Sequence, residues 1–268
     1  MAAEYLFSRW DGLRGKFKKG FIFLFLDYDG TLTGIVSSPD KAIIPDKNKR
    51  LLSSLSKSPF CKVAVISGRS LKNIRRIVGV KGLIYAGNHG LQIEGPKTAF
   101  KINLQVGFKA ALNKIKKELV RGLSGIKGVL IEDKGLTLSL HFRLVEEGKV
   151  PLVKKIFNKI LIPYLAAKRA RIVTGKKVYE IRPPAKWDKG KAVLWLLQRE
   201  KGFNVKRQVI PVYIGDDVTD EDAFKALGRK GLTIFVGSRP ALSGARYYLK
   251  DTGEVTDLLT RISRLAKD

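Results

Sequence analysis

Two aspartates separated by one residue are the clearest chemical feature of this 268-residue sequence. Asp27 and Asp29 follow six consecutive apolar residues, 21–26, and precede a Gly-Thr pair. An apolar run of that length, closed by a turn, is typical of a strand buried on both faces. In an extended chain, residues i and i+2 point the same way, so both carboxylates can face one small volume. Like charges crowded together need a cation or a proton to coexist, which suggests phosphoryl chemistry around a bound metal.

A second group of acids lies far along the chain. Residues 214–224 include five acids within seven positions, directly after another apolar run. Mg²⁺ prefers hard oxygen ligands and often takes only one or two carboxylates. Asp216 could therefore complete a Mg²⁺ shell with Asp27 and the backbone carbonyl of Asp29. An acidic first helical turn, favoured by the helix dipole, is the simpler explanation for residues 220–222, but it does not explain Asp216.

The residue types suit phosphoryl transfer through a carboxylate. Asp27 can attack phosphorus to give an aspartyl phosphate, and Asp29 can protonate the departing oxygen and then activate water. Ser67 ends a predicted strand, where its hydroxyl and nearby backbone N–H groups would bind the phosphoryl group. Lys189, at a predicted helix start, could neutralise the phosphoryl oxygens and hold Asp27 ionised. Taken singly, each has a plainer explanation: a strand-to-loop turn for the acid pair, a helix cap for Ser67 and a surface lysine for Lys189.

Strands and helices must bring these side chains together. The predicted strands are 21–26, 62–66, 83–86, 209–214 and 233–236, and the predicted helices are 4–18, 45–56, 70–78, 189–198 and 220–227. Their alternation predicts an α/β fold with a doubly wound, Rossmann-like parallel sheet. In such sheets ligands bind outside the carboxyl ends of the strands, which is where the candidate residues fall.

The pattern changes in the middle of the chain. Two predicted helices there alternate with two predicted hairpins, at 106–122, 128–143, 151–168 and 170–181. We therefore expect an inserted α+β cap, or lid, at 93–182, and a core made of 1–92 and 183–268. Residues 93–181 carry 19 Lys and Arg against 7 Asp and Glu, which suits a lid that closes on a negative ligand.

Composition limits the possible partners. The net charge is +28, but Lys and Arg are spread along the whole sequence, so we do not expect nucleic acid to be the main partner. The single Cys61 excludes an intramolecular disulfide and fits a reducing compartment. No apolar stretch approaches the roughly 18 residues that cross a bilayer, and the first residues lack a secretory-signal pattern. We expect a cytoplasmic protein without a membrane partner. The oligomeric state is open, and we expect a monomer.

The four chemical stretches occur in the order acid pair, Ser, Lys, acid pair, each just after a strand or at the start of a helix. This order resembles that of the haloacid dehalogenase-like phosphohydrolase superfamily, over nearly the whole chain. The resemblance implies a nucleophile, an acid/base, two phosphate-binding residues and a Mg²⁺ site. The implied nucleophile is Asp27, and the implied acid/base is Asp29. Ser67 and Lys189 would bind the phosphate, and Asp27, Asp29 and Asp216 would hold Mg²⁺. Asp217 or Asp220 would contact the metal ligands from outside the coordination shell.

Finer detail is similar to the trehalose-6-phosphate phosphatase family. The stretches that carry this similarity are LDYDGTL (26–32), ISGR (66–69), AGNHG (86–90), LHFR (140–143), GKKVYEIRP (175–183) and GDDVTDEDAF (215–224). The last is the most specific, because the wider superfamily usually has a shorter acidic motif. By this resemblance Glu180 and Lys176 of the cap would bind sugar hydroxyls, and the cleft would be lined by Arg69, Asn88, His89 and Arg143.

The resemblance implies a Mg²⁺-dependent phosphatase that hydrolyses a phosphorylated disaccharide, trehalose 6-phosphate, through an aspartyl phosphate. Another capped sugar phosphatase, acting on sucrose phosphate or mannosyl-3-phosphoglycerate, would carry the same core motifs. A phospho-accepting receiver domain also gathers acids and a lysine at strand ends, but it is shorter and lacks a lid. A basic nucleic-acid-binding protein would instead bind DNA with steep salt dependence and show no turnover.

Overall fold

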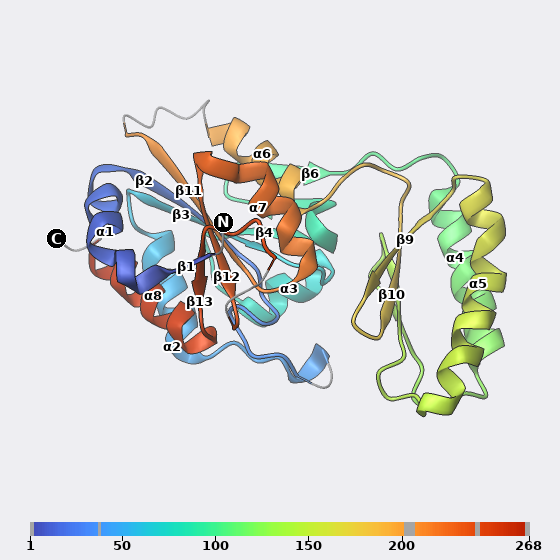
Figure 1. Ribbon diagram of the computed structural model, residues 1–268. Helices are drawn as coiled ribbons and strands as arrows, with labels where there is room; N and C mark the ends of the chain where they lie inside the picture. Colours follow the sequence, from blue (N-terminus) through green and yellow to red (C-terminus); the bar gives the residue numbers. More distant parts are fainter. Residues whose placement is uncertain (1–2, 37–38, 201–206, 239–241, 266–268) are drawn as a thin grey trace. The chain divides into compact units, whose positions relative to one another are not determined.

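The computed structural model describes residues 3–36, 39–200, 207–238 and 242–265. The chain forms two compact units (Figure 1). The core unit combines Met1–Lys101 with Trp187–Asp268, and the inserted unit is Ile102–Lys186. No helix in the described ranges is both long enough and apolar enough to cross a membrane.

A nine-stranded sheet forms the centre of the core unit, in the order β1-β13-β12-β11-β2-β3-β4-β5-β6. The strands are β1 (Glu4–Tyr5), β2 (Phe21–Leu26), β3 (Cys61–Ile66), β4 (Ile84–Gly87), β5 (Gln92–Gly95), β6 (Thr98–Lys101), β11 (Val209–Gly215), β12 (Leu232–Val236) and β13 (Tyr247–Leu249). From β1 across the sheet to β4, each strand runs parallel to the next one. The last strands, β4, β5 and β6, pair antiparallel. The predicted α/β class with a mainly parallel sheet is confirmed.

Helices cover both faces of this sheet. They are α1 (Trp10–Lys19), α2 (Asp46–Ser56), α3 (Leu71–Val78), α6 (Lys189–Glu200), α7 (Glu221–Leu227) and α8 (Thr252–Leu265). Alternate residues of β2 face opposite helix layers: Leu24 and Leu26 pack in the cluster with α1, α2, α3 and α8, and Phe23 and Phe25 pack in the cluster with α6 and α7. Burial on both faces explains why β2 is apolar throughout.

The pairing register brings the candidate residues to one edge of the sheet. β2 lies between β11 and β3, and Leu26 is level with Ile214 on one side and Val65 on the other. Because the three strands are parallel, the segments that begin at Asp27, Ser67 and Asp216 all leave the sheet at its carboxyl edge.

The inserted unit has a four-stranded antiparallel sheet in the order β7-β8-β10-β9. Its elements are α4 (Phe108–Leu123), β7 (Leu130–Asp133), β8 (Leu138–His141), α5 (Val150–Ala166), β9 (Arg171–Gly175) and β10 (Val178–Arg182). Leu138, Leu140 and Ile181 of the sheet share a buried cluster with residues of α4 and α5. Both predicted hairpins are present, as β7–β8 and β9–β10.

Two details differ from the sequence predictions. The hairpin of β5 and β6 pairs with β4 and extends the core sheet, so the first boundary between the units lies at 101/102 instead of 92/93. The second boundary lies at 186/187 instead of 182/183. The single helix predicted at 4–18 is wrong at its start: Glu4–Tyr5 pairs with β13, a 3₁₀ turn follows, and α1 begins only at Trp10. Both differences come from strand pairing, with the neighbouring β4 in the first case and with the distant β13 in the second, which local periodicity does not reveal.

Candidate active site

Asp27, Lys189 and Asp220 form a buried charged cluster at the carboxyl edge. Nζ of Lys189, the first residue of α6, donates hydrogen bonds to Oδ1 of Asp27 and to Oδ1 of Asp220, both at 2.7 Å. The three residues are 4%, 3% and 0% exposed. A buried ammonium is tolerated only when paired, and two carboxylates compensate this one. Lys189 therefore faces the predicted nucleophile, as the sequence suggested, and is no surface lysine.

Asp220 connects this cluster to the acidic loop. Besides Lys189, its Oδ1 accepts a hydrogen bond from the hydroxyl of Tyr213 at 2.7 Å. Its Oδ2 accepts the backbone N–H groups of Asp216 and Asp217 at 3.1 and 3.0 Å. A carboxylate offers about four lone-pair positions, and these four donors occupy them. Asp220 therefore fixes its neighbours and has no oxygen left to offer.

Asp216 approaches the loop after β2. The hydroxyl of Thr31 donates to its Oδ1 at 3.3 Å. Gly30 has φ +88°, and a Cβ there would lie 2.0 Å from Oδ2 of Asp216. Only glycine therefore combines this backbone conformation with this close approach. The Gly-Thr pair of the first motif shapes the space that Asp216 occupies.

The donor set suits a divalent cation. Carboxylate oxygens of Asp27, Asp216 and Asp220 lie within 4.8 Å of one another, but those of Asp220 already accept the four donors described above. Within the described ranges, Oδ2 of Asp27 and Oδ2 of Asp216 accept no hydrogen bond. Two neighbouring carboxylates with available oxygens match the preference of Mg²⁺ for hard ligands. Asp27 and Asp216 are the residues that fit this role best.

The carboxylate of Asp29 is paired with Arg69. Nη2 and Nε of Arg69 donate to its Oδ1 and Oδ2 at 2.6 and 2.8 Å, a bidentate geometry. Nη1 of Arg69 donates to Asn73 at 3.2 Å, and the guanidinium stacks on the ring of Tyr28. The predicted acid/base residue and a predicted sugar ligand therefore contact each other. The carboxylate of Asp29 is not part of the acidic group above, and the contribution of its backbone carbonyl to a metal site stays a prediction.

The loops after β3 and β4 are bonded together. The carbonyls of Ser67 and Arg69 accept the backbone N–H groups of His89 and Asn88 at 2.9 and 2.7 Å. A Cβ on Gly68 would lie 2.7 Å from the ring of His89, so a larger residue there would displace that ring. Ser67 is 1% exposed, and its Oγ accepts the N–H of Arg69 at 3.1 Å.

The helix cap considered for Ser67 belongs to another residue. The side chain of Ser70 accepts the backbone N–H of Asn73 at the start of α3. Asn88 and His89 both have left-handed backbones, with φ of 51° and 56°. Such conformations cost about 1 kcal/mol or more outside glycine and are frequent at functional sites. Ser67, Asn88 and His89 therefore line one bonded pair of loops at the carboxyl edge.

Three of the predicted sugar ligands belong to the inserted unit. Glu180, on β10, is 6% exposed and accepts hydrogen bonds from Arg182 at 2.7 Å, Thr137 at 3.1 Å and Lys134 at 3.4 Å. Arg143 and Lys176 are exposed, and Nη2 of Arg143 lies 3.5 Å from the backbone carbonyl of Lys176. Glu180 thus has a structural role in its sheet, whatever else it binds.

Burial and crowding change the protonation of the cluster. Burial raises the pKa of Asp27 well above its usual value, although the ammonium of Lys189 opposes the rise. Burial and then the charge of Asp220 raise the pKa of Asp216 to about 7. Burial alone would lower the pKa of Lys189, but Asp220 and Asp27 outweigh it and the net shift is upward. A cation near Asp27 and Asp216 would therefore compete with protons for these two carboxylates.

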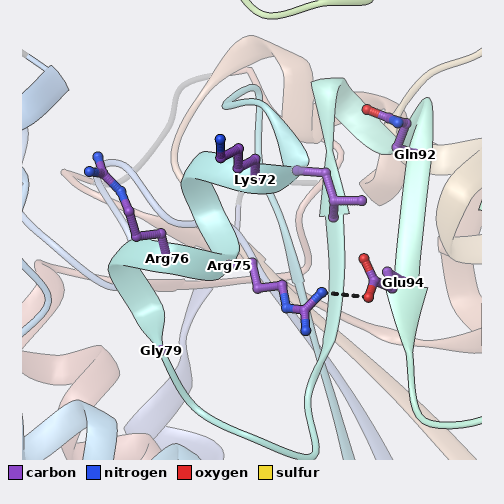
Figure 2. A pocket seen from close by; sticks show the side chains of 7 residues that line it. Lys72, Arg75, Arg76, Gly79, Gln92 and Glu94 are labelled. Carbon is purple, nitrogen blue, oxygen red and sulfur yellow. Dashed lines mark hydrogen bonds and ion pairs between the residues drawn. The ribbon is translucent and has the colours of Figure 1, made fainter.

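A separate hollow of about 620 Å³ lies beside α3 and β5. Leu71, Lys72, Arg75, Arg76, Gly79, Gln92 and Glu94 line it. Figure 2 shows the guanidinium of Arg75 directed at the carboxylate of Glu94, with which it forms an ion pair. None of the candidate catalytic residues lines this hollow, so it is distinct from the carboxylate cluster.

The fold defines the class. A haloacid dehalogenase-like hydrolase from Bacteroides thetaiotaomicron superposes with a TM-score of 0.64 and 16% identity, over 90% of this chain and 99% of that one. The C-terminal domain of trehalose-6-phosphate phosphatase from C. albicans superposes with a TM-score of 0.82 and 23% identity, over 99% of both chains. The chain has the haloacid dehalogenase-like fold.

Sequence comparison identifies the family within this class. The trehalose-phosphatase family profile matches residues 25–251. Probable trehalose-phosphate phosphatase D of Arabidopsis thaliana is 39% identical over 252 residues, which cover 90% of this chain and 67% of the relative. The chain spans about two thirds of the length of the curated relatives it matches. It belongs to the trehalose-phosphatase family, whose members are phosphoric monoester hydrolases.

Sequence reasoning missed Tyr213 and left Asp220 only as a possible support for the metal site. Tyr213 lies in the middle of β11, where an aromatic residue is expected for packing alone, so its hydroxyl carried no signal. Asp220 was explained by the dipole of the following helix. The available signal was its spacing, because four residues after Asp216 is one helical turn and allows the side chain to bond back to the preceding loop.

Proposed function

We propose that this chain hydrolyses trehalose 6-phosphate to trehalose and phosphate with the help of Mg²⁺. One observation carries the proposal: in a chain of the trehalose-phosphatase family, Asp27 and Asp216 each have an available carboxylate oxygen beside the buried ammonium of Lys189. The similarity to trehalose-phosphate phosphatases supports the proposed substrate class, and the residues of the site support the proposed chemistry.

Asp27 is the proposed nucleophile. One oxygen of its carboxylate attacks phosphorus, the bond from phosphorus to the sugar oxygen breaks, and Asp29 gives that oxygen a proton. Water then attacks phosphorus, loses its proton to Asp29 and releases Asp27 and inorganic phosphate. Asp29 needs an oxygen of its own for these transfers. We therefore infer that Arg69 releases at least one oxygen of Asp29 when the substrate binds.

Lys189 and Ser67 are proposed to bind the transferring phosphoryl group. Two of the three ammonium protons of Lys189 are directed at Asp27 and Asp220, which leaves the third for a phosphoryl oxygen. Mg²⁺, held by Asp27, Asp216 and the backbone carbonyl of Asp29, would reduce the repulsion between the attacking carboxylate and the phosphate dianion.

The inserted unit is proposed to act as a lid that selects the sugar. Glu180, Lys176 and Arg143 would contact its hydroxyl groups, together with Arg69, Asn88 and His89 of the core unit. A disaccharide needs several fixed donors and acceptors for its orientation, which these side chains supply. The excess of Lys and Arg in the inserted unit would also attract an anionic substrate.

A panel of phosphate esters tests the proposal. Trehalose 6-phosphate, sucrose phosphate, mannosyl-3-phosphoglycerate and p-nitrophenyl phosphate are assayed with Mg²⁺, and Asp27→Asn serves as the inactive control. We expect the highest kcat/KM on trehalose 6-phosphate. A clear preference for one of the other two sugar phosphates would favour the alternative function, a capped phosphatase that acts on that sugar phosphate. Absence of turnover on all four, with salt-sensitive DNA binding, would favour the nucleic-acid alternative.

A further inference from the structure

Tyr213 is buried on the side of the sheet that faces α6 and α7. It is 0% exposed, and its ring lies between Phe25, with ring centroids 6.5 Å apart, and Phe224, with centroids 5.7 Å apart. Phenylalanine would pack equally well among these rings. Burying a hydroxyl costs free energy unless it is hydrogen-bonded, so the oxygen of Tyr213 needs a partner.

That partner is Asp220. The hydroxyl of Tyr213 donates to Oδ1 of Asp220 at 2.7 Å, the same oxygen that accepts the ammonium of Lys189 at 2.7 Å. Lys189 in turn donates to Oδ1 of Asp27 at 2.7 Å. A continuous chain of three buried hydrogen bonds therefore links a rigid ring in the sheet to the carboxylate at the end of β2.

We propose that Tyr213 is a positioning residue for the phosphoryl transfer assigned above, and that it acts through Asp220 on Lys189. The proposal rests on the proposed function. The position of the Lys189 ammonium depends on the direction of Oδ1 of Asp220, and two donors from opposite partners fix that oxygen. Without the hydroxyl, Oδ1 of Asp220 accepts a hydrogen bond from Lys189 alone. The Asp220 carboxylate and the Lys189 ammonium can then rotate together away from Asp27.

The size of the effect follows from geometry. Misplacing a reacting group by about 1 Å can cost up to about a hundredfold in rate. Tyr213→Phe removes one of the four hydrogen bonds to Asp220 and none to Asp27, so we expect a smaller effect, a fall in kcat of about tenfold. KM for trehalose 6-phosphate should change by less than about twofold, because Tyr213 does not reach the substrate.

Tyr85→Phe is a matched control. Tyr85 is also buried in the core sheet, at 5% exposed, and its hydroxyl donates to the backbone carbonyl of Val80 at 2.6 Å. It packs in the cluster on the other face of the sheet, away from Asp220. The same hydroxyl is lost at the same depth, so Tyr85→Phe should keep kcat within about twofold of the parent chain.

A second measurement needs no substrate. In the metal-free protein with ¹⁵N-labelled lysine, the ammonium of Lys189 should give a resolved NMR signal that exchanges slowly with water, since it is 3% exposed and doubly bonded. Tyr213→Phe should shift that signal and speed its exchange, and Tyr85→Phe should leave it unchanged. This result would support the proposal even if the parent chain failed to hydrolyse trehalose 6-phosphate, which would refute only the proposed function. An unchanged signal in Tyr213→Phe, or equal losses of kcat in both variants, would overturn the positioning role.

Discussion

The guanidinium of Arg69 holds both carboxylate oxygens of Asp29, at 2.6 and 2.8 Å, across 40 residues of sequence. Arg69 is 7% exposed and is further fixed by Asn73. An arginine expected to contact a sugar therefore orients the proposed acid/base residue. This contact changes what a substitution at position 69 should do.

Arg69→Met should impair the hydrolysis of every phosphate ester. The side chain keeps most of its volume but no longer orients Asp29, so we expect kcat to fall about 10- to 100-fold. Both trehalose 6-phosphate and p-nitrophenyl phosphate should lose at least this factor, because Asp29 serves both, and any additional loss on the disaccharide would measure the contact of Arg69 with the sugar. Steady-state assays of the two esters decide the matter. A loss confined to the disaccharide would show instead that Arg69 acts through the sugar.

Lys189→Met should destabilise the core unit. The substitution leaves Asp27 and Asp220 buried without their shared cation, and breaking a buried pair costs about 3–5 kcal/mol. Urea unfolding followed by circular dichroism measures the loss. Lys72→Met, at an exposed position on α3, is the control and should change stability by less than about 0.5 kcal/mol. Equal stability of the two variants would mean that the buried cluster is not held by charge pairing.

Asp216 should make the metal-free protein less stable as pH rises. Its pKa is raised from 3.8 to about 7 in the folded chain, so between these values the native state binds more protons than the unfolded state. The stabilising contribution is complete below about pH 4 and is lost as pH rises through 7. Asp216→Asn should then raise stability at pH 8 by about 2–4 kcal/mol and change it little at pH 4.

Thermal unfolding in EDTA and in Mg²⁺ checks this. Mg²⁺ should raise the Tm of the parent chain more at pH 8 than at pH 5, since protons compete for Asp216, and much less in Asp216→Asn. A Tm that does not respond to Mg²⁺ at either pH would remove Asp216 from the proposed metal site.

Glu180→Gln should separate sugar recognition from chemistry. If Glu180 contacts the sugar, kcat/KM should fall far more for trehalose 6-phosphate, by about 100-fold, than for p-nitrophenyl phosphate. Glutamine is preferable to alanine, because alanine would leave the buried Arg182, which is 5% exposed, without a hydrogen-bond partner at position 180. Glu147→Gln, an exposed acid paired with Lys177 in the same unit, is the control. Equal losses for both esters would limit Glu180 to holding its own sheet together.

The sequence was sufficient for the elements that carry the site. The apolar runs of β2 and β11 end at Asp27 and just before Asp216, and parallel pairing then places their ends side by side. The alternation of strands and helices predicts a parallel sheet, although not the order of its strands, and the position of the acids needs only the strand ends. These are local patterns, so Asp27, Asp216 and Lys189 could be predicted to converge.

Other features depend on contacts that no local pattern contains. β5 (QIEG) and β6 (TAFK) are too short for their sequences to indicate strands, and their pairing with β4 and with each other makes them part of the core sheet. The direction of the Arg69 side chain and of the Tyr213 hydroxyl depends on packing. The helix α8, by contrast, has a local signal, because Val255, Leu258, Leu259 and Ile262 have the spacing of an amphipathic helix and are buried.

Covalent trapping tests the central claim most directly. The protein is mixed with trehalose 6-phosphate and Mg²⁺, quenched within the first turnover and treated with borohydride, which reduces an aspartyl phosphate to homoserine. Peptide mass spectrometry should then find homoserine at position 27 and aspartate at positions 29, 216 and 220. Turnover of the substrate with Asp27 unmodified, or modification at another of these aspartates, would contradict the assignment of Asp27 as the nucleophile.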